Sequence, residues 1–176
     1  MAGPSVTADT REIRLIREAD SLEALTQLLH RAYASLAAMG WRYRATHQDV
    51  ATTQRRIAQG ECYVMADGTR VVGTVLLVPP SARSKHCAWY DRLDVAVISQ
   101  FAVEPELQRQ GLGRRLLDFA ERRALDLGAV EVAVDTAEPA VHLVELYQAR
   151  GYRFICHTQW DHTNYRSVVL SKRLTP

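Results

Sequence analysis

The apolar residues in the first third of the chain follow two spacings, one typical of strands and one typical of helices. In residues 12–20 they alternate with polar residues, which predicts a short strand. In residues 20–40 leucine and alanine recur every three or four positions, which predicts a helix that ends at a glycine. Asp20 and Glu23 have the spacing of a capping box, so we expect the helix to begin there. Residues 49–60 carry a weaker helical pattern.

The middle of the chain is rich in β-branched residues. Two apolar runs, 62–66 and 71–78, flank an Asp-Gly-Thr turn and predict a β-hairpin. A third run covers residues 94–103, and an amphipathic helical pattern follows in residues 110–127. Residues 130–135 then form another apolar run, which completes a strand–helix–strand unit. Such a unit implies two parallel strands joined by a right-handed crossover.

The last third of the chain predicts one more helix and a closing hairpin. The helix covers residues 139–150, and the hairpin joins strands at 152–160 and 165–174. The complete order of elements is β α α β β β α β α β β, which predicts a mixed α/β fold. We expect residues 12–176 to form a single domain and residues 1–11 to be a disordered lead-in.

Composition and charge narrow the class of protein. The 176 residues are 47% hydrophobic and 24% charged, which is ordinary for one soluble globular domain. The net charge of +2 is too balanced to indicate a nucleic-acid partner. No apolar run approaches the ~20 residues that cross a membrane, and the first residues do not resemble a signal peptide. Cys62, Cys87 and Cys156 lack the spacing of a disulfide framework, so we expect buried thiols in a cytoplasmic protein.

Gly111 and Gly113 lie where the strand at 94–103 gives way to a helix. The first N–H groups of a helix have no internal partner, and glycine lets an anion approach them closely. The pair therefore indicates either a phosphate cradle or a tight loop. The Gly-Lys-Ser/Thr of a P-loop is absent. A dinucleotide fingerprint fits poorly, because Leu116 stands where its third glycine belongs and Glu131, at the distance of the ribose-binding acid, lies inside the next strand.

A longer motif gives the glycines a more specific context. The segment Gln108–Gly113 reads Gln-Arg-Gln-Gly-Leu-Gly, and Pro105 lies in the turn before it. Further on, residues 146–154 read LYQARGYRF, similar to the pattern LY-x-x-x-GF. These motifs and the order of elements resemble the GCN5-related N-acetyltransferase (GNAT) superfamily over nearly the whole chain. The resemblance implies a mixed sheet of about seven strands with about four helices, in which parallel strands 4 and 5 splay apart.

The resemblance also implies a site for acetyl-CoA. The pantetheine arm would enter the gap between the splayed strands, and the pyrophosphate would rest on backbone amides of the glycine loop. The residues that the resemblance assigns to acetyl-CoA are Phe101, Ala102, Val103, Gln108, Arg109, Gln110, Gly111, Leu112, Gly113, Arg114 and Tyr147. Tyr147 would also act as the catalytic acid that protonates the leaving thiolate; the alternative is a core aromatic residue. Ala140 replaces an asparagine that contacts the cofactor in many members of the superfamily.

The resemblance places the amine acceptor between two segments, the loop that joins the first two helices and the final hairpin. Trp41, Tyr43 and Trp160 are the candidate residues for the pocket wall, although Trp160 and Tyr165 also suit an ordinary cross-strand pair. The general base stays unassigned. The available acids, Glu104, Asp91 and Asp94, are expected at turns or on the surface. We predict no metal, because His157 and His162 lack a zinc spacing.

The sequence therefore predicts an acetyl-CoA-dependent N-acetyltransferase. It would transfer the acetyl group to a small-molecule or peptide amine by direct attack in a ternary complex. One alternative is a catalytically weak sensor module that binds acyl-CoA, which the missing asparagine allows. A nicotinamide-binding protein is the third possibility. A homodimer is also possible, because the final strands offer an open edge; no nucleic-acid or membrane partner is expected.

Overall fold

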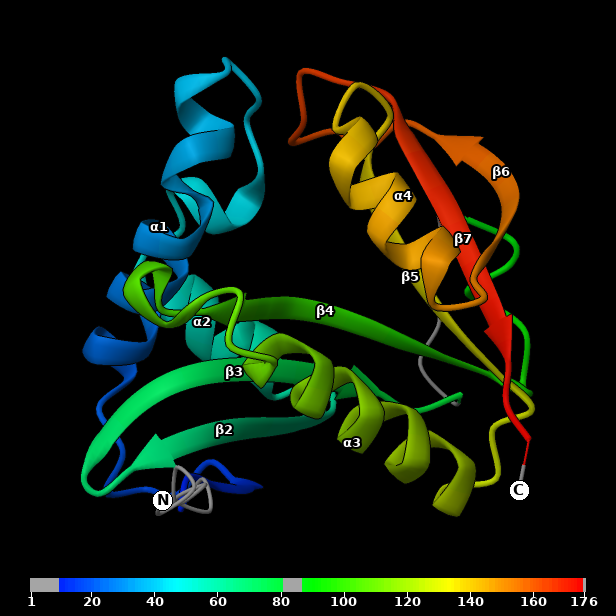
Figure 1. The fold of residues 1–176 in the computed structure, drawn as a ribbon. Helices are drawn as coiled ribbons and strands as arrows, with labels where there is room; N and C mark the ends of the chain where they lie inside the picture. The colour runs from blue at the N-terminus through cyan, green and yellow to red at the C-terminus, as the bar shows by residue number, and fades with distance from the viewer. Residues whose placement is uncertain (1–9, 81–86, 176) are drawn as a thin grey trace, which may run out of the picture.

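A computed structural model describes residues 10–80 and 87–175, and the predicted lead-in lies almost wholly outside this part (Figure 1). Its elements are β1 (Glu12–Leu15), α1 (Leu22–Ala38), η1 (Arg44–Thr46), α2 (Val50–Ile57), β2 (Glu61–Asp67), β3 (Arg70–Val78), β4 (Val95–Val103), η2 (Pro105–Leu107), α3 (Leu112–Asp126), β5 (Glu131–Ala137), α4 (Val141–Ala149), β6 (Arg153–Thr158) and β7 (Ser167–Arg173), where η marks a 3₁₀ helix. The order matches the predicted one.

The strands form one mixed sheet in the order β1-β2-β3-β4-β5-β7-β6. Strands β4 and β5 are parallel, and all other neighbouring pairs are antiparallel. The predicted hairpin of β2 and β3 and the predicted parallel unit of β4, α3 and β5 are therefore confirmed. The seven strands and four α-helices of the described residues also confirm the fold that the family resemblance implies.

The parallel strands stay paired for only a short distance. Their register runs from Val95 opposite Glu131 to Val97 opposite Ala133, and no pairing follows beyond it. Within β4, the register with β3 shifts around Gln100, whose φ of 46° lies in the left-handed region. Such a bulge bends a strand and increases its twist. Figure 1 shows β4 crossing the molecule while β5 turns away from it, which opens the sheet at its centre.

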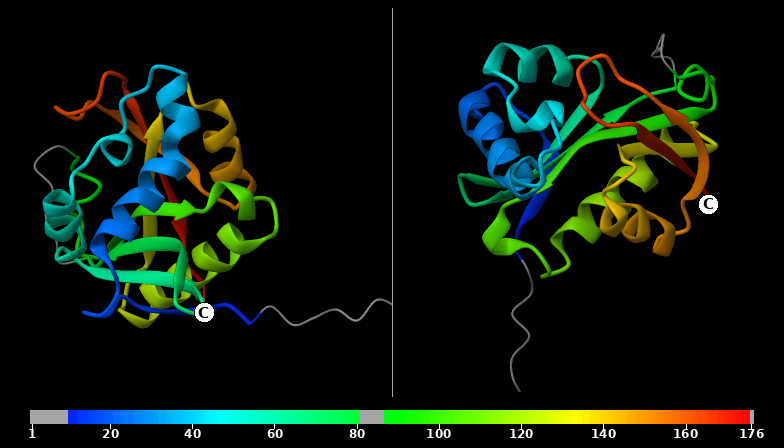
Figure 2. Two further views of the ribbon diagram at one scale, coloured as in Figure 1. Left: turned by 90° about the vertical axis from the view of Figure 1, so that its left-hand side faces the viewer. Right: turned by 90° about the horizontal axis from the view of Figure 1, so that it is seen from above.

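Helices cover both faces of the sheet, and the alternation of side chains along β2 shows how. Cys62 and Val64 pack with Leu25 and Leu28 of α1 in one apolar cluster. The intervening Tyr63 and Met65 point the other way and pack with leucines of α3 in the largest cluster of the protein. Figure 2 shows α1 and α2 on one side of the sheet, with α3 and α4 on the other.

The start of α1 differs from the prediction. The N-cap is Ser21, whose Oγ accepts a hydrogen bond from the amide of Ala24 at 3.1 Å. Asp20 is held instead by Arg14, which donates to both carboxylate oxygens at 2.7 and 2.8 Å. The capping box predicted for Asp20 and Glu23 is therefore wrong: the N-cap lies one residue later, at Ser21, because an ion pair with β1 holds the aspartate.

All three cysteines are free thiols, and Cys62 and Cys87 are buried as predicted, whereas Cys156 is half-buried. Among residues 10–80 and 87–175, no helix combines the length and the apolar character that a membrane span requires.

Candidate active site

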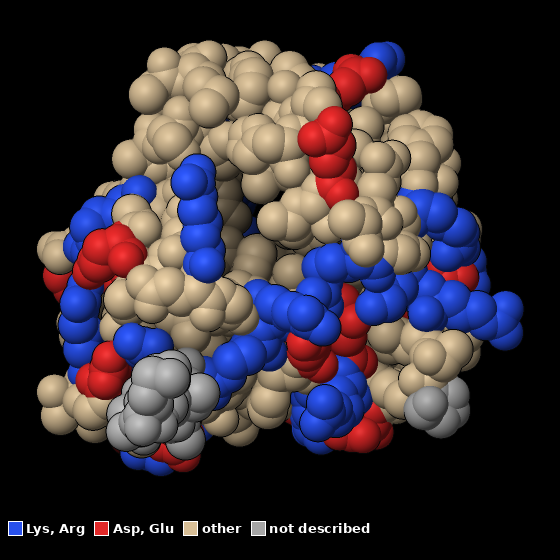
Figure 3. Space-filling model, in the orientation of Figure 1, with Lys and Arg blue, Asp and Glu red and all other residues tan. Residues whose placement is uncertain are grey.

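The splayed strands form the wall of a cavity of about 1470 Å³. One part of it, which we call the loop end, is lined by β4 residues 101–103 and by residues of the loop 108–114. The other part, which we call the aromatic end, is lined by side chains that include Tyr43, Asp135 and Trp160. Figure 3 shows the surface hollowed between the α1 side and the α4 side, with basic side chains gathered around the start of α3.

The loop end is built from backbone. Arg109 and Gly111 both adopt left-handed conformations, with φ of 62° and 82°, and Gly111 is the N-cap of α3. In the described residues, none of the amides from Arg109 to Arg114 donates a hydrogen bond within the protein, whereas the amide of Arg115 bonds to the Gly111 carbonyl at 3.0 Å. Free amides at the positive end of a helix dipole form an anion-binding concavity.

The two glycines of this loop serve different purposes. A Cβ atom at Gly111 would meet no atom within 4 Å, so this glycine is required by its left-handed backbone and not by crowding. A Cβ atom at Gly113 would lie 3.2 Å from the Phe101 ring, so this glycine lets α3 pack closely on β4. Gln108 fixes the loop to the same strand, because its Nε2 donates to the Val103 carbonyl at 3.1 Å.

Tyr147 reaches the cavity from α4. The side chain is only 8% exposed and its ring packs against Tyr152, with centroids 5.5 Å apart. Its hydroxyl makes no hydrogen bond to any described residue, although the residue lines the cavity. Burial raises the pKa of the Tyr147 phenol far above its ordinary value of 10.0, so the phenol keeps its proton at neutral pH. It is a protonated donor available to a bound molecule.

Asp135 lies at the aromatic end, on the part of β5 that has separated from β4. One carboxylate oxygen accepts a hydrogen bond from the Tyr90 hydroxyl at 3.0 Å, and the other accepts one from Trp160 Nε1 at 2.9 Å. Burial raises the pKa of Asp135, and these two hydrogen bonds oppose only part of the effect. A carboxylate with a raised pKa beside a cavity is a typical proton acceptor.

The family model of the acetyltransferase (GNAT) family matches residues 22–152. The chain belongs to this family.

A relative from Bacillus subtilis (strain 168), S-(2-succino)cysteine N-acetyltransferase, is 32% identical over 141 residues, which cover 79% of this chain and 82% of the relative. Among solved structures, a GNAT family acetyltransferase from Elizabethkingia anophelis with acetyl-CoA bound aligns with a TM-score of 0.66 at 17% identity, covering 94% of this chain and 99% of that one. The ribosomal-protein-S18-alanine N-acetyltransferase from Escherichia coli aligns with a TM-score of 0.69 at 18% identity, covering 95% and 96%. The chain is accordingly an acyltransferase with the GNAT fold.

Most of the residues that sequence reasoning assigned to acetyl-CoA come together in this GNAT cavity. Two do not present their side chains to it. The Leu112 side chain is buried in the main core, and Gln110 points away and donates to the Glu106 carbonyl at 3.3 Å. Only their backbone amides are available to a ligand. The assigned residues that line the cavity are Phe101, Ala102, Val103, Gln108, Arg109, Gly111, Gly113, Arg114 and Tyr147.

The aromatic residues were placed less well by the sequence. Tyr43 and Trp160 line the cavity, whereas Trp41 lies outside its lining and packs against the neighbouring apolar cluster. The cross-strand pair suggested for Trp160 and Tyr165 is wrong, because β6 ends at Thr158 and β7 begins only at Ser167, so both residues lie in the connection between the strands. Trp160 stacks on Tyr90 with centroids 6.0 Å apart, and the Tyr165 ring lies 4.8 Å from that of Tyr43.

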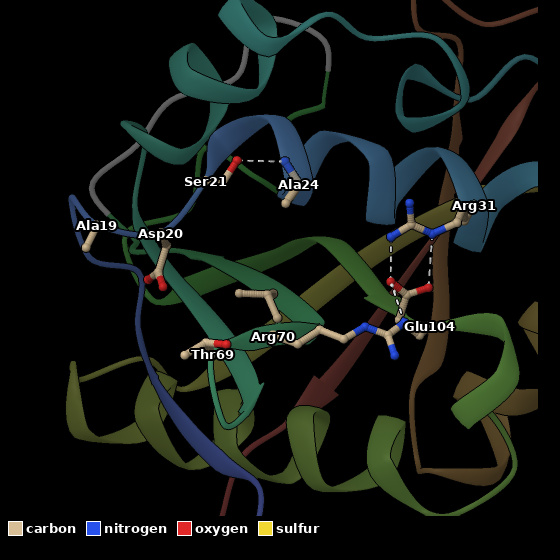
Figure 4. Close-up of a pocket in the computed structure, with 9 residues that line it drawn as sticks. Ala19, Asp20, Ser21, Ala24, Arg31, Thr69, Arg70 and Glu104 are labelled. Atoms are coloured by element: carbon tan, nitrogen blue, oxygen red, sulfur yellow. Dashed lines mark hydrogen bonds and ion pairs between the residues drawn. The ribbon is translucent and has the colours of Figure 1, made fainter.

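Glu104 contradicts the prediction of a surface acid. Its side chain is 1% exposed and forms a two-point ion pair with Arg31 of α1, in which Nε lies 3.1 Å from Oε2. Figure 4 shows this pair at one end of a smaller pocket of about 300 Å³, which shares no lining residue with the large cavity. Asp91 and Asp94 do not line the large cavity either. Asp135, which closes the apolar run at 130–135, is the carboxylate that the sequence reading missed.

Ala140 occupies the N-cap of α4 and makes no side-chain cap hydrogen bond. It is fully buried in the cluster that holds Tyr43 and Tyr165. Ala140 has no polar side-chain atom and does not line the large cavity, so the contact expected from the family has no equivalent at this position.

Proposed function

We propose that the chain transfers an acetyl group from acetyl-CoA to the primary amine of an acceptor, by direct attack in a ternary complex. The observation that carries the proposal is one cavity with free backbone amides at one end and a carboxylate of raised pKa at the other. The solved relative from Elizabethkingia anophelis, which binds acetyl-CoA, supports the choice of donor. The relative from Bacillus subtilis, which is named as an N-acetyltransferase, supports the choice of reaction.

The loop end would hold the donor. The amides from Arg109 to Arg114 would bind the pyrophosphate, and Arg109 and Arg114 add positive charge around it. The edge of β4 that no longer pairs with β5 would receive the pantetheine arm at residues 101–103. Acetyl-CoA supplies a thioester whose carbonyl carbon accepts the amine and whose sulfur leaves.

The aromatic end would activate the acceptor. A free amine has a pKa of about 10 and must lose a proton to attack. Asp135 accepts that proton, directly or through water, because its raised pKa brings it closer to the operating pH. The nitrogen then forms a bond to the carbonyl carbon and the carbon–sulfur bond breaks. Tyr147 donates its phenolic proton to the leaving thiolate, and solvent restores both residues.

The second candidate function is an acyl-CoA sensor that binds without turnover. The observation that favours it is Ala140, which offers no amide to the cofactor. The two functions share the loop end and differ at the aromatic end, where a sensor has no need of Asp135 or a free Tyr147 hydroxyl.

Two measurements on the purified chain separate these functions. Melting temperature is measured with acetyl-CoA and with NAD, and release of free thiol from acetyl-CoA is followed with a panel of primary amines. We expect stabilisation by acetyl-CoA alone, and thiol release that depends on the amine. Stabilisation without thiol release for any amine favours the sensor. Stabilisation by NAD and not by acetyl-CoA contradicts both functions.

A further inference from the structure

Two arginines at the aromatic end have no part in the chemistry above. Arg44 comes from η1 and Arg56 from α2, and both line the cavity. Within the described part of the chain, neither guanidinium forms an ion pair with a carboxylate. Arg44 Nη2 donates to His162 Nδ1 at 2.8 Å, and Arg56 Nη1 donates to Gln48 Oε1 at 2.7 Å. Each guanidinium has five N–H donors, so most of them remain available to a ligand.

Buried amides hold Arg56 in place. Gln48, which accepts from Arg56, is itself 3% exposed and donates through Nε2 to Gln100 Oε1 at 2.9 Å and to Thr53 Oγ1 at 2.7 Å. Gln100 lines the cavity, and its own Nε2 is buried with no partner among the described residues. The guanidinium is therefore oriented before any ligand arrives, which is how binding sites reduce the entropic cost of recognition.

The two arginines bring partly buried positive charge to the aromatic end of the cavity. Burial is the largest influence on Arg56 and lowers its pKa to about 10; the charge of Arg44 also lowers this pKa, whereas Tyr33 and the carboxylate of Asp135 raise it. Arg56 therefore remains cationic at neutral pH. Burial and the same two arginines lower the pKa of His162 to about 4, so this imidazole is neutral and accepts from Arg44. Asp135 lies close enough to Arg56 for their charges to interact, but its hydrogen bonds come from Tyr90 and Trp160 and not from the arginines. Two partly buried positive charges beside the carboxylate of Asp135 leave an excess of positive charge that a bound anion would offset.

We propose that Arg44 and Arg56 bind a carboxylate of the acceptor, which is therefore an α-amino acid or a related small molecule with an amine and a carboxylate. This inference rests on the proposed function and names the acceptor class for the same cavity. The planar fork of arginine matches a carboxylate with two parallel hydrogen bonds. The carboxylate held there leaves the amine to reach Asp135, which lines the same end of the cavity. A polyamine has no carboxylate, and the N-terminal residue of a peptide has no α-carboxylate, because that group forms the peptide bond.

The first test measures binding without turnover. The chain is saturated with coenzyme A, and its melting temperature is measured with succinate, a simple dicarboxylate, and with the neutral succinamide. We expect succinate to stabilise the wild type and succinamide to leave it unchanged. Arg56→Gln and Arg44→Gln should each abolish the effect of succinate. Arg55→Gln is the matched control, because Arg55 lies on the same helix, is exposed and does not line the cavity.

Each outcome of the succinate test either supports or overturns the inference. Equal stabilisation of the wild type and the Arg56→Gln variant by succinate overturns the inference, as does a wild type that succinate leaves unchanged. Succinate stabilisation that requires both arginines, in a chain that never releases thiol, supports the carboxylate site and contradicts the acetyltransferase proposal. The failures of the two proposals are thus distinguishable.

A kinetic test applies to any amino-acid acceptor that the amine panel identifies. Arg56→Gln should raise the KM for the acceptor by about tenfold to a hundredfold and change kcat much less, because a charge-assisted hydrogen bond to the bound acceptor is lost. Arg56→Lys should recover part of the loss. The carboxamide of the same acceptor should react equally slowly with the wild type and with Arg56→Gln; a carboxamide that still distinguishes the two proteins contradicts a carboxylate partner for Arg56.

Discussion

The two ends of the cavity are built in different ways. The loop end consists of backbone amides from one continuous segment, 109–114, held open by left-handed residues and by the start of α3. The aromatic end consists of side chains from segments far apart in the sequence, among them Arg44 of η1, Arg56 of α2, Asp135 of β5 and Trp160 beyond β6. The loop end therefore depends mainly on the conformation of its backbone, whereas the aromatic end depends on the identity of each side chain.

This difference explains what the two ends are suited to do. Backbone amides bind any phosphate in the same way, which suits a donor used throughout a family. Side chains from separate elements can be substituted independently of one another, which suits an acceptor that differs among members of the family. A substitution at one end should therefore change one step of the reaction and leave the other intact.

Asp135→Asn should give the largest difference between the effect on catalysis and the effect on acetyl-CoA binding. Loss of the proton acceptor should lower kcat/KM by about 10²- to 10³-fold, while the affinity for acetyl-CoA stays unchanged. Because burial raises the pKa of Asp135, the acidic limb of the wild-type rate profile should lie above the pKa of about 4 that is ordinary for aspartate. Initial rates of thiol release between pH 4 and 9 check both statements. A variant that retains wild-type turnover removes Asp135 from the reaction.

Tyr147→Phe keeps the ring packing against Tyr152 and removes only the hydroxyl. We expect kcat to fall about 10²-fold with little change in the affinity for acetyl-CoA, because the thiolate then leaves without a proton donor. Single-turnover measurements with saturating acetyl-CoA report this step. Undiminished turnover would leave Tyr147 as a core residue only.

Gly111→Val should act at the loop end. A branched residue at a φ of 82° costs about 1–2 kcal/mol, so the loop should relax and the affinity for acetyl-CoA should fall roughly tenfold. Gly128→Val is the control, because Gly128 has a similar φ of 84° just beyond the other end of α3, with no atom within 4 Å of its added Cβ. The control should lose stability and keep its affinity. Equal losses of affinity in both variants would show that helix stability and not the cradle is responsible.

The smallest expected effect concerns stability. The pKa of Asp135 is raised in the folded state, so the folded chain holds this proton more tightly than the unfolded chain. The resulting stabilisation is present below the ordinary pKa and is lost as pH rises through the raised value. Asp135→Asn does not titrate, so it should melt a few degrees above the wild type at pH 7, and the difference should shrink as pH falls toward 4. A difference that grows as pH falls contradicts the sign of this shift.

The loop end could be predicted because its residues are local in sequence. The positions of Gln108 and Gly111 follow from a strand end, a turn and a helix start within a few residues, and these requirements leave a recognisable spacing. Residues with tertiary partners were harder to predict. Glu104 looks like a solvated acid after a strand, yet Arg31, 73 positions earlier, pairs with it and covers it.

The aromatic end left no comparable pattern. Asp135 ends an apolar run, as many surface acids do, and only the divergence of β4 and β5 brings it to a cavity. Arg56 lies on a weak helix among polar residues, where its contact with buried Gln48 cannot be read from spacing. The N-cap of α1 was also hard to predict from spacing. Ser21 caps the helix because Asp20 forms an ion pair with Arg14 instead.

Titration calorimetry with acetyl-CoA, on the wild type and on the Gly111→Val and Asp135→Asn variants, tests the separation of the two ends most directly. We expect the same Kd for the wild type and for Asp135→Asn, and a Kd about tenfold higher for Gly111→Val. One Kd for all three proteins, or a loss of acetyl-CoA affinity in Asp135→Asn comparable to that in Gly111→Val, would contradict a donor cradle made of backbone and an acceptor site made of side chains.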